Sequence, residues 1–261
     1  MRRISLFTLD TPYREPLTIW GYEYGRADAR KSVAIVGSMR GNEVEQTYVC
    51  ADLVRRLAAL EEKGAMDPDR RVLVAPSANA FSMNISERFW PVDNTDINRM
   101  FPGYDLDETT QRIADGLFRA VQGYDYGIQL CSFYLPGDFQ PHVRVTETGQ
   151  ITKESLELAD AFGFPYVVAK KPSSFDTTTL NYNWQVWGDA RIQRVRARHG
   201  IALHPQRRRG RGLHPALPRR PRRGQVHPAG RFPLDVARRG GACGRSVRAG
   251  RGLHSAGRRA R

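Results

Sequence analysis

Histidine is nearly absent from the first 188 residues of this chain, and lysine is wholly absent from the last 73. His142 is the only histidine in residues 1–188, and the other five lie in residues 189–261. Because imidazole is the commonest metal ligand and the side chain that titrates nearest neutral pH, this scarcity limits the chemistry open to the first segment. A metal site built on several histidines is excluded there.

Cysteine is also scarce, and long apolar runs are missing. Cys50, Cys131 and Cys243 are odd in number and far apart, so neither a disulfide framework nor a cysteine zinc cluster is indicated. No stretch approaches the ~18 apolar residues of a membrane span, and the basic N-terminus reaches Asp10 before any apolar run of useful length. These absences predict a cytoplasmic protein of a reducing compartment, with no membrane partner.

Acidic residues almost vanish after about Gly188. Residues 189–261 hold 21 Arg and only two acids, whereas residues 1–188 hold 20 Lys and Arg against 25 acids. The first segment is therefore slightly acidic, and the second carries the whole net charge of +14 and more. The composition predicts two parts: one α/β domain over residues 1–188, long enough for a single core, and an Arg/Gly/Pro-rich tail over residues 189–261.

Two interpretations of the tail compete. Its arginines, as in Arg207–Arg211, are typical of a disordered arm that neutralises nucleic-acid phosphates. However, such modules usually interleave aromatics for base stacking, and this tail has only Phe232. Arg, Gly, Pro and Ala without Lys are what GC-rich codons give when translated out of frame. We therefore favour the hypothesis that the residues after about Gly188 are a disordered, out-of-frame translation, and a nucleic-acid partner follows only if the tail is genuine.

The first segment alternates between strand-like and helix-like patterns, which is typical of an α/β layered domain. Short apolar runs predict buried strands, and apolar residues at helical spacing predict helices between them. The strands are expected at residues 31–38, 71–76, 126–131 and 165–169, and the helices at 44–63, 107–121 and 153–162. Residues 75–104 form a long polar loop, and loops of this length inside a domain are usually functional. Sites in such sheets lie beyond the carboxyl ends of the strands, so residues 38–43, this loop and the residues after Leu130 should converge.

Two motifs in these segments carry a family resemblance. Gly37-Ser38-Met39-Arg40-Gly41-Asn42-Glu43 follows a strand, and Asp96-Ile97-Asn98-Arg99-Met100-Phe101-Pro102-Gly103 lies in the long loop. Together they resemble the succinylglutamate desuccinylase/aspartoacylase family of zinc carboxypeptidase-like hydrolases, over roughly residues 30–188. The resemblance implies a three-layer α/β/α fold with a mixed, mostly parallel sheet. It also implies zinc as cofactor and hydrolysis of an amide beside a carboxylate.

The family's zinc ligands fall on altered residues in this chain. By resemblance, the two ligands of the first motif fall on Arg40 and Glu43, the third on Cys131, and the Asp that supports the third on Gln129. Arg40 cannot be deprotonated, and one Glu with one Cys makes an incomplete site, so zinc is expected to be absent or weakly bound. An Arg40–Glu43 ion pair in place of the metal is the favoured alternative. His142 could assist, although a structural role suits it better.

Parts of the substrate site persist. By resemblance, Asn98 and Arg99 hold the substrate's carboxylate and Arg88 stabilises the oxyanion. Arg40 with Arg88 and Arg99 would form an electropositive pocket for a small carboxylate-bearing ligand. The alternatives are that Arg99 pairs with an aspartate of the same loop, Asp93 or Asp96, and that Arg88 is a surface charge.

The residue of the family's general base would follow Trp187, beyond the change of composition, so the sheet is also expected to be incomplete on its C-terminal side. The sequence therefore predicts a hydrolase-like domain whose metal site is degraded and whose activity is impaired. A non-catalytic carboxylate or anion binder on the same scaffold is the first alternative, and nucleic-acid binding through the basic tail is the second.

Overall fold

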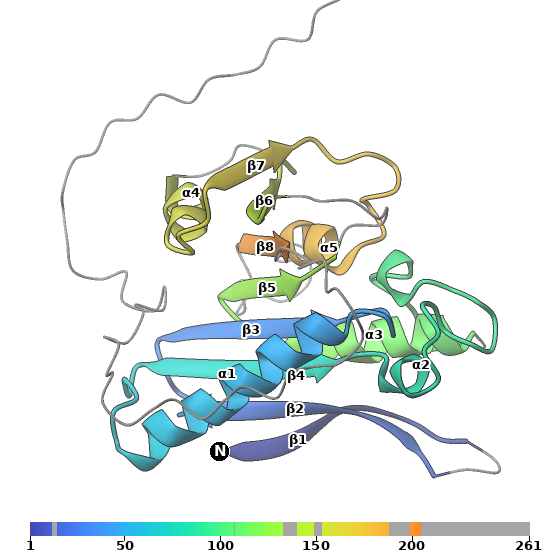
Figure 1. Cartoon of the computed structure of the whole chain (residues 1–261), viewed down its shortest axis with the longest axis horizontal. Coiled ribbons are helices and arrows are strands. Elements are labelled where there is room, and N and C mark those ends of the chain that lie inside the picture. Colours follow the sequence, from blue (N-terminus) through green and yellow to red (C-terminus); the bar gives the residue numbers. More distant parts are fainter. Residues whose placement is uncertain (12–14, 107, 133–139, 149–152, 188–198, 205–261) are drawn as a thin grey trace, which may run out of the picture.

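A computed structural model describes residues 1–11, 15–106, 108–132, 140–148, 153–187 and 199–204. Its centre is one mixed sheet with the strand order β1-β2-β4-β3-β5-β8-β6-β7 (Figure 1). Four neighbouring pairs, β3/β4, β3/β5, β5/β8 and β6/β7, are parallel, and the pairs β1/β2, β2/β4 and β6/β8 are antiparallel. The strands are β1 (Arg2–Leu9), β2 (Leu17–Gly25), β3 (Lys31–Ser38), β4 (Arg70–Ser77), β5 (Tyr126–Leu130), β6 (His142–Thr146), β7 (Tyr166–Lys170) and β8 (His199–His204).

Helices cover both faces of this sheet. The helices α1 (Val44–Glu62) and α4 (Lys153–Asp160) lie on one face, and α3 (Thr109–Val121) and α5 (Leu180–Trp187) lie on the other. Figure 1 shows α1 crossing β3 and β4. Alternate residues of the central strands pack toward opposite helix layers, because side chains of a strand alternate between its two faces: Val72 and Val74 face α1, whereas Leu73 and Ala75 face α3. The three-layer α/β/α prediction is confirmed.

The central elements agree with the sequence pattern to within a few residues. All four predicted strands and all three predicted helices are present. The loop after β4 contains only the short helix α2 (Ala80–Asn84) and the 3-10 turn η1 (Ile97–Arg99), so its prediction as a long connection is also confirmed. Elements that the sequence analysis did not predict are the antiparallel β1/β2 pair, β6, α5 and β8.

The largest difference from the sequence prediction is β8. These six residues fall inside the segment that was expected to lack regular structure, yet they pair with β5 on one side and β6 on the other. The expectation of an unstructured segment is wrong for this stretch, whereas the expected incompleteness of the sheet on its C-terminal side stays a prediction. The physical reason is that β5 and β6 each present a row of backbone donors and acceptors that need a partner, which outweighs the composition of the tail.

The rest of the tail, residues 188–198 and 205–261, lies outside the described residues, so the disordered, out-of-frame and nucleic-acid interpretations stay predictions. No helix among the described residues is long and apolar enough to span a bilayer. The cytoplasmic location likewise stays a prediction.

Candidate functional site

Three segments converge at the carboxyl ends of β3, β4 and β5, as the sequence predicted. The turn after β3 contacts the long loop through an ion pair between Arg40 and Asp96. The same turn contacts the end of β5 through a hydrogen bond from the Ser132 hydroxyl to Glu43. This arrangement follows from parallel strand order, which places the ends of β3, β4 and β5 on one edge.

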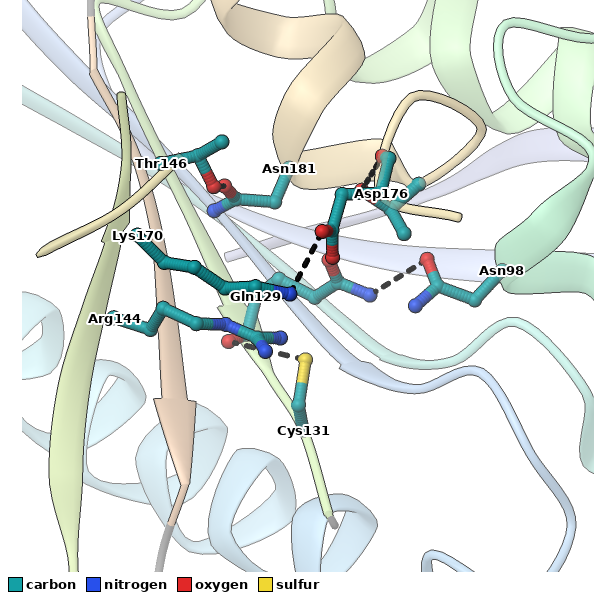
Figure 2. Close-up of a pocket in the computed structure, with 9 residues that line it drawn as sticks. Asn98, Gln129, Cys131, Arg144, Thr146, Lys170, Asp176 and Asn181 are labelled. Carbon is teal, nitrogen blue, oxygen red and sulfur yellow. Dashed lines mark hydrogen bonds and ion pairs between the residues drawn. The ribbon is translucent and has the colours of Figure 1, made fainter. Parts of the chain in front are cut away.

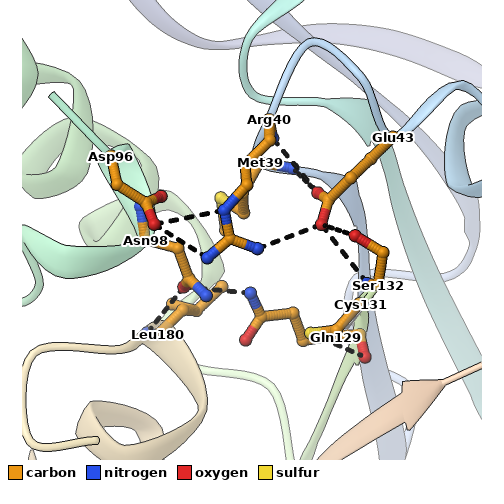
Figure 3. Close-up of polar contacts among 9 residues, drawn as sticks. All are labelled: Met39, Arg40, Glu43, Asp96, Asn98, Gln129, Cys131, Ser132 and Leu180. Atoms are coloured by element: carbon orange, nitrogen blue, oxygen red, sulfur yellow. Dashed lines mark hydrogen bonds and ion pairs between the residues drawn. The ribbon is translucent and has the colours of Figure 1, made fainter. Parts of the chain in front are cut away.

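Arg40 lies at the centre of this network, with only 5% of its surface exposed. Its Nη1 donates to Glu43 Oε1 (3.1 Å), and its Nε and Nη2 both donate to Asp96 Oδ2 (3.1 and 2.8 Å) (Figure 3). Burial alone would lower the pKa of the guanidinium, but the charges of Asp96 and Glu43 outweigh it and raise the pKa above its ordinary value. Arg40 is therefore a permanent cation held between two carboxylates, and the expected Arg40–Glu43 ion pair is present.

Both carboxylate oxygens of Glu43 are already engaged. Oε2 accepts from the backbone N–H groups of Met39 (3.0 Å) and Arg40 (3.1 Å). Oε1 accepts from the hydroxyl (2.7 Å) and the N–H (3.3 Å) of Ser132, in addition to Arg40. A cation at this carboxylate would have to displace donors that the fold supplies, so Glu43 acts here as the fixed anion that closes the turn after β3.

Cys131 is the third position implied by the family resemblance, directly after β5. Its thiol is buried, and its Sγ lies 3.9 Å from the Gln129 carbonyl oxygen. Burial, with a further contribution from the Glu43 charge, raises the pKa of this thiol to about 12. Zinc binds the thiolate, so coordination here would have to displace the proton of this buried thiol.

The residues present do not fit a zinc ion. One of the three implied ligand positions holds a guanidinium and the second is saturated with hydrogen bonds, so Cys131 alone would remain to hold the metal. Within the described parts of the chain, no three His, Cys, Asp or Glu side chains gather in a way that could hold a metal ion. His142 lies at the start of β6, where its Nδ1 is 3.0 Å from the Gln140 carbonyl oxygen.

Asn98 is held in place from two sides. Its Oδ1 accepts from Gln129 Nε2 (3.0 Å) and from the Leu180 N–H (3.3 Å), so the amide joins η1 to β5 and α5. Gln129 thus supports a neighbouring amide. Asn98 joins the same cluster as Arg40, Glu43 and Cys131 (Figure 3).

The two remaining predicted arginines point to other partners. Arg99 Nη1 donates to the Phe175 carbonyl oxygen (2.8 Å) in the loop before α5. The alternative, a pairing of Arg99 with Asp93 or Asp96, is not found among the described residues, and Asp96 binds Arg40 instead. The Arg88 guanidinium lies 5.2 Å from the Phe89 ring centre. The backbone carbonyl oxygen of Arg88 accepts a hydrogen bond from the Gly41 N–H (3.0 Å). The roles of Asn98 and Arg99 in carboxylate binding and of Arg88 in oxyanion stabilisation stay predictions.

A cavity of about 20 Å³ lies beside this network, on the side of β6 and β7 (Figure 2). The residues that line it include Asn98, Gln129, Cys131, Arg144, Lys170 and Asn181. Sequence analysis missed the last three. The available signal was the alternation in His142-Val143-Arg144-Val145-Thr146, where the two valines are buried on one face and Arg144 and Thr146 share the other.

Solved structures with the same architecture define the class of protein. A metallo-carboxypeptidase from Burkholderia cenocepacia superposes with a TM-score of 0.59 at 14% identity, over 78% of this chain and 55% of that chain. An aspartoacylase family protein from Mesorhizobium loti gives a TM-score of 0.56 at 22% identity, over 73% of this chain and 56% of that one. At these identities the comparison shows the fold, which is that of the carboxypeptidase-like α/β proteins.

The family follows from the sequence. The family model of the succinylglutamate desuccinylase/aspartoacylase catalytic domain matches residues 29–187, and the chain belongs to this family. The N-alpha-acetyl-L-2,4-diaminobutyric acid deacetylase of Halomonas elongata is 30% identical over 137 residues, which are 51% of this chain and 38% of that protein. The chain thus spans less than two fifths of that relative and just over half of the structural relatives. Its relatives thus include a deacetylase by sequence and a metallo-carboxypeptidase by fold.

Proposed function

We propose that this chain is a member of the deacylase family that binds a small carboxylate-bearing ligand without hydrolysing it through a metal. The family relationship supports the ligand class, because its members act on amides that stand beside a carboxylate. The altered ligand positions support the loss of metal chemistry. This assigns the chain the role of a binding protein on a hydrolase scaffold.

The observation that carries the proposal is the buried position of the Arg40 guanidinium between Glu43 and Asp96. A catalytic zinc needs about three neutral or anionic ligands and one open position for water. Here a fixed +1 charge fills the place of one ligand and satisfies the carboxylate of another. Arg40 supplies positive charge to the turn, but it offers no coordination position at which a water could be bound and activated as on a metal.

The proposal is tested by metal content and turnover together. The purified chain is incubated with zinc, dialysed and analysed for bound metal, and then assayed with N-acetyl amino acids. We expect far less than one zinc per chain and no turnover above background. The matched variant Arg40→His/Cys131→His restores imidazoles at both altered positions, and it should bind close to one zinc and melt at a higher temperature when zinc is present.

Two results would contradict these expectations. One tightly bound zinc per unmodified chain, with turnover that disappears in Glu43→Gln, would show that the chain is a metallohydrolase and would overturn the proposal. Failure of the double variant to gain zinc would show that the two positions are not metal positions in this fold.

A further inference from the structure

Two hydrogen-bond donors in the cavity of Figure 2 lack an acceptor among the described residues. One is the guanidinium of Arg144 on β6, and the other is the amide nitrogen of Asn181 at the start of α5. Neither residue belongs to the motifs that carry the family resemblance. Donors that converge on one cavity without acceptors indicate a site for an acceptor group.

Asn181 is 5% exposed, and the orientation of its amide is fixed by its neighbours. Its Oδ1 accepts from the Thr146 hydroxyl (3.1 Å) and from Gln185 Nε2 (3.2 Å). Its Nδ2 is fully buried and has no partner among the described residues. A buried donor without an acceptor costs about 1–3 kcal/mol, a cost that a ligand oxygen in the cavity removes.

Arg144 differs from the other cation of the cavity. Lys170 Nζ donates to Asp176 Oδ2 (2.8 Å), and Ser173 donates to the same oxygen. Burial raises the pKa of Asp176, but these bonds outweigh it and bring the pKa to about 2, so this pair is fully charged and mutually neutralised at neutral pH. No carboxylate of the described residues pairs with Arg144, which leaves one uncompensated positive charge beside Cys131.

We propose that Arg144 and Asn181 form a carboxylate-binding site, in which the guanidinium donates to a ligand carboxylate and Asn181 Nδ2 donates to one of its oxygens. A planar guanidinium matches a carboxylate through two parallel hydrogen bonds. The cavity of about 20 Å³ accommodates a group of that size and no complete ligand, so the remainder of the ligand extends out of it. The inference rests on the proposed function and deepens it, because it names the anchor of the ligand.

The test is calorimetric titration of the full chain with N-acetylglycine and with its uncharged amide, N-acetylglycinamide. We expect saturable binding of the acid and at least tenfold weaker binding of the amide, since the two differ only in the group that Arg144 recognises. Arg144→Gln should weaken binding of the acid by at least tenfold. Asn181→Asp keeps the oxygen that accepts from Thr146, replaces the free donor by an acceptor, and should weaken binding to a similar extent.

Two further variants keep the result interpretable. Arg144→Lys retains the charge but loses the planar fork, so affinity should fall less than in Arg144→Gln. Arg112→Gln removes an exposed arginine of α3 that pairs with Asp105, and its affinity should equal that of the unmodified chain. Melting curves of every variant establish that a loss of binding is not a loss of fold.

The outcomes that contradict these expectations distinguish a wrong site, a wrong ligand class and a wrong proposed function. Binding that survives Arg144→Gln and Asn181→Asp but is lost in Arg99→Gln overturns this site and leaves the proposed function standing. Bound zinc with hydrolysis of N-acetylglycine overturns the proposed function, whichever arginine is needed. If the unmodified chain binds inorganic phosphate but neither N-acetylglycine nor succinate, the carboxylate assignment is wrong. If it binds none of the three, the site itself is wrong.

Discussion

At the scale of single residues, the buried ion cluster of Arg40, Glu43 and Asp96 is the most consequential feature of this chain. Removing the guanidinium leaves two carboxylates in a dry environment without a counter-charge. Arg40→Leu should therefore lower the free energy of unfolding by about 3–5 kcal/mol, measured by urea denaturation. Arg112→Leu breaks an exposed pair with Asp105 and should cost less than about 1 kcal/mol. An equal, small loss in both variants would mean that water already reaches the cluster.

Sequence reasoning located the positions of this cluster better than its contacts. The motif identified Arg40, Glu43, Asn98 and Cys131 as neighbours, because a family motif encodes which residues meet at the ends of parallel strands. It offered Asp96 only as one alternative partner of Arg99, whereas the aspartate binds Arg40. Which of two nearby cations an aspartate pairs with depends on side-chain direction and burial, and neither is encoded in sequence spacing.

At the scale of elements, Glu23 on β2 ties three parts of the fold together. Its carboxylate is 2% exposed, forms an ion pair with Arg2 on β1, and accepts from Arg71 Nε on β4 (2.6 Å) and from the Tyr124 hydroxyl after α3 (2.9 Å). Burial raises the pKa of Glu23, but the bonds from Arg71, Tyr124 and Arg2 outweigh it and hold the pKa below its ordinary value. A lowered folded-state pKa stabilises the fold above the unfolded-state pKa of about 4.3, and this contribution is lost as pH falls further.

The substitution Glu23→Gln tests this linkage. At pH 7 it should lower the free energy of unfolding by about 1.5–3 kcal/mol, because hydrogen bonds to a charged group are replaced by bonds to a neutral one. The difference from the unmodified chain should shrink as the pH is lowered below about 4.3, as followed by urea denaturation across a pH series. Glu62→Gln, at an exposed position of α1, serves as the control. A difference that stays constant with pH would show that Glu23 is not ionised in the folded state.

Helices and strands could be predicted where the sequence pattern that indicates them lies within the element itself. Continuous apolar runs identified β3, β4 and β5, and helical spacing identified α1 and α3. The edge pair β1/β2 was missed because neither strand is a continuous apolar run. The strand β6 was missed because it is short and its alternation spans only five residues.

At the scale of the whole molecule, β8 decides whether the two halves of the sheet form one unit. It pairs with β5 from Tyr126 to Leu130 and with β6 from His142 to Val145, and no other strand of the described chain joins β5 to the β6/β7 pair. The composition of residues 189–261 gave no indication of this strand, because its stability derives from the two strands beside it. The cavity lies across the same junction, with Gln129 on β5 and Arg144 on β6.

Ala202 lies at the point where this junction and the cavity meet, since its backbone is in register with Gln129 on one side and Arg144 on the other. Proline in a central strand removes a ladder hydrogen bond and is not tolerated there. Ala202→Pro should therefore separate β6 and β7 from β5, lower the melting temperature and abolish carboxylate binding together. Ala27→Pro is the matched control. Ala27 is exposed and occupies the second position of a turn in which the Ala29 N–H donates to the Arg26 carbonyl oxygen. Proline is favoured at that position of a turn. If Ala202→Pro melts and binds like the unmodified chain, β8 does not hold the sheet together. The distance between Gln129 and Arg144 must then be set by α5, which packs on β5 and accepts a hydrogen bond from Thr146 of β6 through Asn181.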